Sequence, residues 1–163
     1  MSWLDRWVFV PYFVLHIIVS LTADIQGVLP NWFLDEHFPT FLRQAVLEYT
    51  AASQDTTLTA PEPWMHSLLL TEAIVQLPFF FIAVYALLAR KNWIRMPAII
   101  YSAHVMTTVI PCVAHIVASD MSIENKMRVA PLYLIFFFVP LLLLVRMASV
   151  DVPFPARQKS KSA

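Results

Sequence analysis

The sequence lacks several features that would assign it to a common soluble class. Gly27 is the only glycine, which excludes a glycine-rich loop that cradles phosphate. Cys112 is the only cysteine, so neither an internal disulfide nor a zinc site built on cysteine pairs can form. Charged residues make up only 13% of the chain and balance to a net charge of zero, which gives no indication of nucleic-acid binding.

Apolar residues dominate what is present. The chain is 59% hydrophobic and its mean hydropathy is +0.66, values typical of membrane proteins. Apolar runs predict four membrane spans at about 7–23, 64–89, 96–118 and 129–147. The first run lacks the basic start and the cleavage site of a signal peptide, so we expect an uncleaved helix. The predicted fold is an all-α membrane protein, a single domain over residues 1–163.

Lysine and arginine are distributed unequally between the two sides of these spans. If the amino terminus is cytosolic, three of these residues lie on the luminal side: Arg43, Lys126 and Arg128. Eight then lie on the cytosolic side: Arg6, Arg90, Lys91, Arg95, Arg146, Arg157, Lys159 and Lys161. This positive-inside bias predicts that both termini are cytosolic, that the loop 24–63 is luminal and that the tail 148–163 is cytosolic.

The luminal loop is long for a segment without structure. Phe41, Leu42, Ala45 and Tyr49 recur at helical spacing after Pro39, which predicts a short amphipathic helix. Such a helix would lie either on the membrane surface or over a mouth between the spans.

Proline is present in every span. Pro78, Pro111 and Pro140 lie well inside their spans, where proline bends a helix and frees carbonyl groups. Membrane helices also tolerate proline without functional consequence. Because polar groups converge at one level, however, we expect four kinked transmembrane helices that enclose an internal ligand cavity.

The main candidate functional residue is Glu72, a carboxyl group in the middle of the second span. It lies eight residues from Trp64, about 12 Å into the helix. An ionisable group at that depth is costly and indicates a functional site. Gln76 lies one turn further along the same face.

Helical rise brings other polar groups to the same level, in the luminal half of the bundle. These are His16 and Asp24 in or at the first span, Thr107 and Thr108 in the third, and Tyr133 in the fourth. Asp24 and Glu72 would form a carboxyl pair in which one member holds a proton. We expect the deeper Glu72 to be neutral and Asp24 to stay charged, able to receive a cationic amine. The alternative is an aspartate at a helix end beside a protonated structural glutamate.

Histidines in the third span are weaker candidates, because a buried histidine more often packs than binds. His16, Glu72 and a histidine such as His104 or His115 would be needed for a metal site, but their spacing matches no metal-binding pattern. We therefore expect no metal and no cofactor.

Four stretches of sequence resemble one family. They are ADIQGVLP from Ala23, APEPWMHS from Ala60, EAIVQLPFFFIAVYALL from Glu72 and NWIRMPAIIYSAHVMTTVIP from Asn92. In order and spacing they are similar to the sigma-2 receptor family of the EXPERA superfamily, and the resemblance covers nearly the whole chain. It implies a kinked four-helix bundle whose apolar cavity opens sideways into the bilayer. It also implies a homodimer that binds sterols, oxysterols and hydrophobic amines.

The resemblance also implies roles for individual residues. The amine-binding aspartate of the family falls on Asp24 and its partner glutamate on Glu72, while a loop aspartate needed for binding falls on Asp55. Residues alone would place Asp55 in an ordinary loop. The polar lining of the family's cavity maps onto His16, Gln76, Thr107 or Thr108, and Tyr133.

The function implied by the resemblance is a non-enzymatic receptor that takes part in cholesterol handling, with a Niemann-Pick-type lysosomal cholesterol transporter as a partner. Lys159 and Lys161 resemble a dilysine retrieval signal, which favours the endoplasmic reticulum membrane. The nuclear envelope and the lysosomal membrane are further candidate locations.

An enzyme is the alternative. The emopamil-binding protein of the same superfamily isomerises the Δ8 double bond of sterols, and Glu72 could supply part of that acid–base chemistry. The isomerase pattern has a histidine and a glycine where this chain has Leu68 and Ala73, and a second glutamate that the third span lacks. The catalytic set is therefore incomplete. A structural adaptor would leave Glu72 without a role, and a transporter would be expected to show a repeat.

Overall fold

The computed structural model describes residues 2–155. All regular elements in this range are helices, and four helical segments are long and apolar enough to cross a membrane: Asp5–Gly27, Pro63–Leu88, Asn92–Ala118 and Ile123–Ala148. The chain is thus an all-α, multi-pass membrane protein, as the sequence predicted. The fourth helix begins six residues before the apolar run at 129, because Ser122 caps it by accepting a hydrogen bond from the backbone N–H of Asn125 at 3.2 Å.

The first span consists of a π-helical turn η1 (Asp5–Phe9), helix α1 (Val10–Thr22) and a 3₁₀ turn η2 (Asp24–Gly27). The connection between the first two spans contains α2 (Asn31–His37) and α3 (Thr40–Ser53), so the amphipathic helix predicted after Pro39 is present. The third span comprises η4 (Asn92–Ile94) and α6 (Arg95–Ala118), and the fourth is α7 (Ile123–Ala148).

The second span is interrupted at Glu72. Helix α4 (Pro63–Thr71) passes through the π-helical turn η3 (Glu72–Gln76) into α5 (Leu77–Leu88). Pro78 explains the interruption, because it cannot donate the backbone hydrogen bond to residue 74 and its ring displaces the preceding turn. π-Helical turns inside longer helices often lie at functional sites, and this one carries both Glu72 and Gln76.

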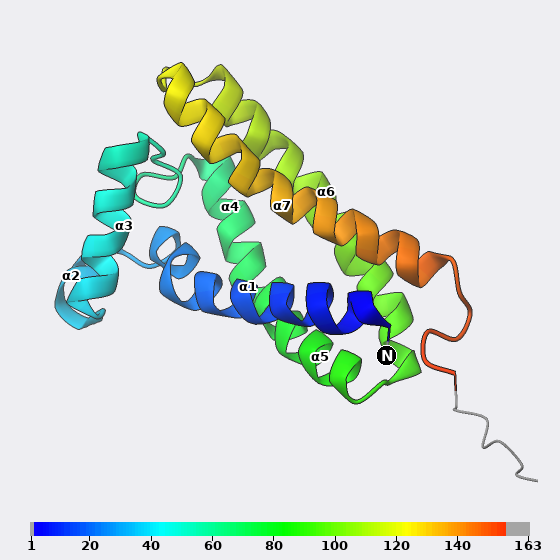
Figure 1. Cartoon of the computed structure of the whole chain (residues 1–163). Helices are drawn as coiled ribbons and strands as arrows, with labels where there is room; N and C mark the ends of the chain where they lie inside the picture. Colours follow the sequence, from blue (N-terminus) through cyan, green and yellow to red (C-terminus); the bar gives the residue numbers. More distant parts are fainter. Residues whose placement is uncertain (1, 156–163) are drawn as a thin grey trace, which may run out of the picture.

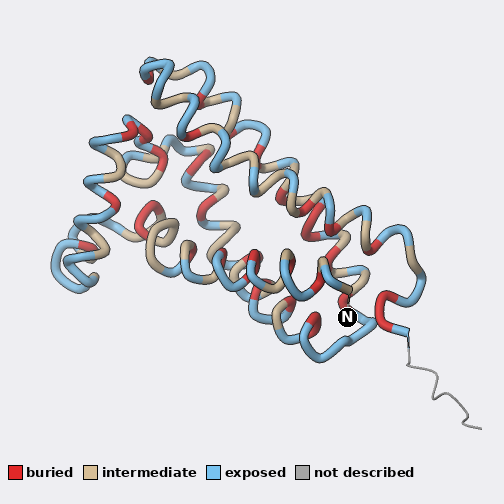
Figure 2. The backbone as a smooth tube through the Cα atoms, viewed as in Figure 1, coloured by how far each residue is buried: buried red, intermediate tan, exposed pale blue. Residues whose placement is uncertain are grey.

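Two helix pairs form the bundle. Helices α6 and α7 pack along their lengths, and α1 packs against α5. Figure 1 shows the two pairs close together near the N-terminus and diverging toward the opposite end, where α4 lies between them and α3 stands across the opening. The main core includes the fully buried Phe9, Phe13, Phe80 and Met147. Buried positions follow the inner sides of the helices, whereas outer positions are exposed (Figure 2) and suit contact with lipid.

The single glycine lies where two elements approach closely. A Cβ atom built on Gly27 would collide with the Leu69 side chain. A larger residue here would push Leu69 out of place, so the absence of a side chain at 27 allows η2 to rest against α4. This contact holds the end of the first span, with Asp24, next to Glu72.

Candidate functional site

A pocket of about 530 Å³ lies between α1, α3, α4, α6 and α7. This volume falls within the range that holds a drug-sized or sterol-sized ligand. Its walls are mainly apolar: Leu42, Val46, Met65, Leu68, Leu69, Val105, Val109 and Phe136. A long, mostly hydrocarbon ligand therefore suits the pocket, and the few polar groups on its wall decide how such a ligand is oriented.

Glu72 is at the centre of the polar groups. Its Oε1 accepts a hydrogen bond from the Ser20 hydroxyl and lies 3.7 Å from Nε2 of His16. The Asp24 carboxyl group is close enough to interact with both Glu72 and Ser20. Only 17% of the Glu72 side chain is exposed. Two carboxyl groups thus meet on the pocket wall, in the pair that the sequence predicted, and both are shielded from water.

Two buried polar atoms near this pair lack partners among the described residues. They are Nδ1 of His16 and Oε1 of Gln76, and both side chains line the pocket. The His16 ring is held in place by Phe80, whose ring stacks on it at a centroid distance of 4.3 Å, and by Phe136. Buried polar atoms are almost always hydrogen-bonded. Both atoms are covered by protein, so each side chain would have to rotate to bring its unpaired atom to a polar group of a molecule in the pocket.

Asp55 is the centre of a second polar cluster, at the α3 end of the pocket. It is buried and accepts hydrogen bonds from the hydroxyl groups of Tyr49 at 3.0 Å, Tyr133 at 3.1 Å and Thr57 at 2.7 Å. Burial, together with the Asp55 carboxylate beside it, raises the pKa of Tyr49, which keeps that phenol protonated as a donor. Both oxygens of Asp55 are thus occupied by protein donors.

This arrangement gives Asp55 a specific structural effect. Its hydrogen bonds connect α3, the loop after α3 and α7. The bond to Tyr133 joins two residues that are 78 positions apart in the sequence. Asp55 lines the pocket, as the family resemblance implied, but its contacts suit a group that holds the pocket wall in place better than one that pairs with a ligand.

The structure places most of the predicted site residues on the pocket wall: His16, Asp24, Asp55, Glu72, Gln76, Thr108 and Tyr133. Thr107 is the exception. It is exposed, and its hydroxyl donates to the carbonyl of Ala103 within α6 at 2.8 Å. Successive residues in a helix point about 100° apart, and the rotation of α6 turns Thr108 and Val109 toward the pocket and Thr107 toward the outer surface. Lys159 and Lys161 lie outside the described residues.

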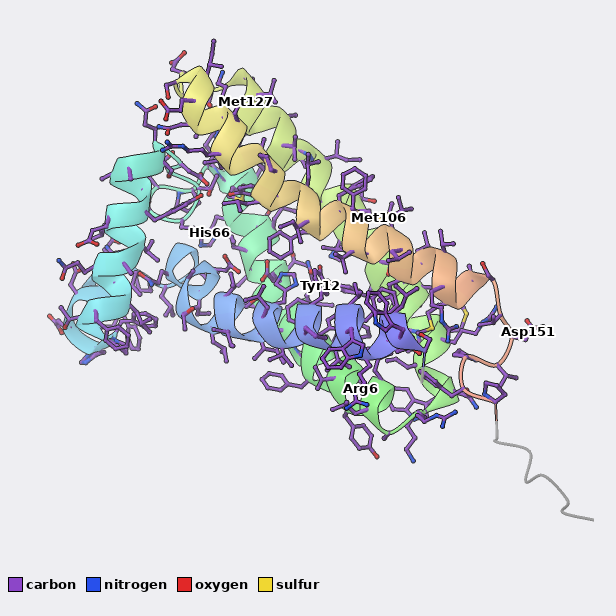
Figure 3. All side chains as sticks on the ribbon, viewed as in Figure 1. Arg6, Tyr12, His66, Met106, Met127 and Asp151 are labelled. Carbon is purple, nitrogen blue, oxygen red and sulfur yellow. The ribbon has the colours of Figure 1, made fainter. Side chains whose placement is uncertain are left out.

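Two residues of α1 at the site, Tyr12 and Ser20, were not anticipated from the sequence. Ser20 and Tyr12 line or touch the site from α1, and the Tyr12 hydroxyl pairs with that of Tyr101 at 3.0 Å. The Tyr12 side chain extends from α1 toward α7 (Figure 3). The sequence contained a signal for both, because residues 12, 16, 20 and 24 form a polar series with a period of four, in a stretch whose other residues are apolar except Thr22.

The rim of the pocket reaches the outer surface of the bundle. Leu15 on α1 is 55% exposed and yet lines the pocket, as do the exposed Leu132 and Ile135 on α7. These residues lie within spans, where the surroundings are lipid. Helix α3 contributes Leu42, Val46 and Tyr49 to the wall. The sequence left open whether this helix lies on the membrane surface or over a mouth between the spans. The structure places it over the pocket.

Fold and site together define a four-helix membrane protein with an apolar pocket and a shielded carboxyl pair on its wall. Residues 41–147 match the family model described as EXPERA (EXPanded EBP superfamily), and the chain belongs to this family. It is 38% identical to Sigma intracellular receptor 2 of Xenopus tropicalis over 152 residues, and 35% identical to that of Homo sapiens over 155 residues. Each match covers 87% of this chain and 86% of the relative.

A more distant relative is the Efficient mitochondria targeting-associated protein 19 of Saccharomyces cerevisiae. It is 23% identical over 152 residues, which cover 80% of this chain and 89% of the relative. The resemblance to the sigma-2 receptor family that the four sequence stretches indicated is thereby confirmed. The chain is a membrane protein with relatives named as intracellular receptors.

Proposed function

We propose that this protein is a non-enzymatic membrane receptor for sterols, oxysterols and cationic amphiphiles that acts in cholesterol handling. One observation carries the proposal: a pocket of about 530 Å³, walled by apolar side chains, has a shielded carboxyl pair on its wall. The names of the relatives, Sigma intracellular receptor 2, support a receptor over an enzyme.

Binding rests on two kinds of contact. The hydrocarbon body of the ligand fills the apolar part, where each 100 Å² of buried apolar surface contributes about 2.5 kcal/mol. The polar head meets Asp24 and Glu72. A hydroxyl group there exchanges hydrogen bonds, and an amine forms an ion pair with Asp24 in a low dielectric. The exposed rim between α1 and α7 supports entry from the bilayer, since such ligands dissolve in lipid rather than in water.

Sterol isomerisation is the second candidate. His16 lies 3.7 Å from Glu72 inside the pocket, and a buried carboxylic acid beside an imidazole could donate a proton to an alkene. Leu68 lines the pocket at the place where the isomerases of the superfamily have a histidine, and the pocket-facing positions of α6 carry Val105, Thr108 and Val109 but no glutamate. The set of acid and base side chains needed to move a proton from one carbon to another is therefore incomplete.

Incubation with a Δ8 sterol distinguishes the two functions. The purified chain is mixed with the sterol, and bound and free sterol are analysed by mass spectrometry. We expect sterol to be retained without conversion, and less to be retained by the Asp24→Asn variant. The Asp120→Asn variant, which changes an exposed carboxyl group outside the pocket, serves as the matched control. Appearance of the Δ7 isomer would make the protein an enzyme and end the receptor proposal.

We also propose a homodimer in the endoplasmic reticulum membrane and a Niemann-Pick-type lysosomal cholesterol transporter as partner. Both rest on resemblance to the family. The dilysine pattern of Lys159 and Lys161 supports the location, since it requires a cytosolic carboxyl terminus, which the distribution of lysine and arginine predicts.

A further inference from the structure

One end of the bundle combines exposed tryptophans with exposed cations. We call this surface the basic rim and define it by Trp3, Trp7, Trp93, Arg6, Arg90 and Lys91. Its tryptophans are 69%, 60% and 51% exposed, in that order along the chain, although tryptophan is usually well buried in proteins. The N-terminus and the ends of α5 and α7 lie at this end of the molecule (Figures 1 and 3).

The cations of the rim are not neutralised by carboxylates among the described residues. Arg6 lies over the Trp7 ring, with its guanidinium carbon 5.3 Å from the centroid. Arg90 makes one long contact, 3.4 Å to the carbonyl of Pro155. Of the carboxylates at this end, Asp5 is buried against Arg146, and the fully exposed Asp151 lies 3.8 Å from Arg95 and pairs with no cation of the basic rim. The rim therefore carries a net positive charge.

Arg90 also occupies an unfavourable backbone position. Its φ is 54°, in the left-handed region that glycine adopts without cost. Helix α5 ends there in a Schellman motif, with Lys91 N–H donating to the Ala86 carbonyl at 2.8 Å and Arg90 N–H to the Leu87 carbonyl at 3.3 Å. Glycine is the usual residue at this place. An arginine that is strained and makes one long side-chain hydrogen bond among the described residues is a candidate for binding a group outside them.

The opposite end of the bundle differs. Among the described residues its three cations are Arg43, which lies 3.4 Å from Asp35, Arg128, which pairs with Glu124, and Lys126, which donates to the Val117 carbonyl at 2.8 Å. Two of these three cations are paired with carboxylates, whereas within residues 2–155 no cation of the basic rim is, so most of the charge available for an external partner lies on the basic rim.

We propose that the basic rim binds the headgroups of anionic phospholipids in the adjoining leaflet. Indole rings favour the boundary between hydrocarbon and headgroup, which places Trp3, Trp7 and Trp93 at the level of the phosphates. Arg6, Arg90 and Lys91 then meet negative charge, which a leaflet rich in phosphatidylserine supplies and phosphatidylcholine does not. None of the residues of the basic rim lines the pocket, so their contacts with lipid do not depend on what the pocket binds.

Quenching of tryptophan fluorescence by brominated lipid tests the proposal. The full chain is reconstituted in phosphatidylcholine vesicles that contain a fixed fraction of brominated phosphatidylserine or brominated phosphatidylcholine. Trp32 and Trp64, outside the rim, give the background. We expect stronger quenching by brominated phosphatidylserine, and we expect this preference to weaken as salt is raised.

The test variant combines Arg90→Gly with Lys91→Gln. Because glycine relieves the left-handed strain, this variant should unfold no earlier than the wild type in phosphatidylcholine, while its preference for phosphatidylserine falls by roughly fivefold per cation removed. The control variant, Lys126→Gln with Arg128→Gln, should keep the preference. No preference in the wild type, an unchanged preference in the test variant, or an equal loss in the control would each overturn the proposal.

Discussion

Binding of a cationic amphiphile is expected to fall by at least ~100-fold in the Asp24→Asn variant, since loss of a buried ionic partner costs about 3–5 kcal/mol. The asparagine side chain would keep a similar shape but offer no charge to the amine. The measurement is a saturation binding experiment with a labelled amine on the reconstituted chain. A neutral sterol should lose less than about tenfold, because an amide still accepts a hydrogen bond from a hydroxyl. The Asp120→Asn variant is the control.

The Glu72→Gln variant tests how the pair shares its proton. If Glu72 is neutral, glutamine replaces one hydrogen-bond donor by another, and amine binding should weaken much less than in Asp24→Asn. An equal loss in the two variants would show that Glu72 carries the charge, contrary to our assignment. Undiminished binding in Asp24→Asn would remove Asp24 from the site altogether.

The second large effect is on stability. Arg146→Met should lower the free energy of unfolding by about 3–5 kcal/mol, because it leaves the buried Asp5 carboxylate without its cationic partner and with only the Ser2 N–H as a donor. Arg146 lies 3.5 Å from Asp5 and also donates to the Pro153 carbonyl at 3.0 Å. Thermal unfolding in detergent, followed by circular dichroism, should show a midpoint lowered by roughly 6–20 °C.

Arg128→Met is the matched control for that experiment. Arg128 forms an ion pair with Glu124, but both side chains are 71% exposed, so its loss should change the free energy of unfolding by less than about 1 kcal/mol. Equal shifts in the two variants would mean that burial of Asp5 does not determine the stability of this end of the bundle.

Much of the fold was predictable because the bilayer imposes strong constraints on sequence. The lengths of the apolar runs located the four spans. The rise per residue of a helix alone placed His16 level with Glu72. The helix after Pro39 followed from apolar periodicity. Each of these predictions depends on local sequence or on the fixed geometry of a helix that crosses a membrane.

What could not be predicted depends on contacts between distant residues. Asp55 is indistinguishable from an ordinary loop residue until α7 brings Tyr133 to it. The choice between Thr107 and Thr108 depends on the rotation of α6 within the bundle, which no local signal sets. The packing of the segment after α7 was likewise not predictable, since Phe154 is buried and its N–H donates to the side-chain oxygen of Asn92 at 2.8 Å.

The central claim is that the pocket holds the ligand with its polar head at Asp24 and Glu72. The most direct measurement is photo-crosslinking with a sterol that carries a photoreactive group near its hydroxyl, followed by mass spectrometry of the labelled peptides. We predict labels within 16–24 and 68–76, and loss of these labels when an unlabelled amine competes. Labels confined to outward-facing residues outside these ranges, such as Ile100, Thr107 and Ile110, and unaffected by the competitor, would contradict the account.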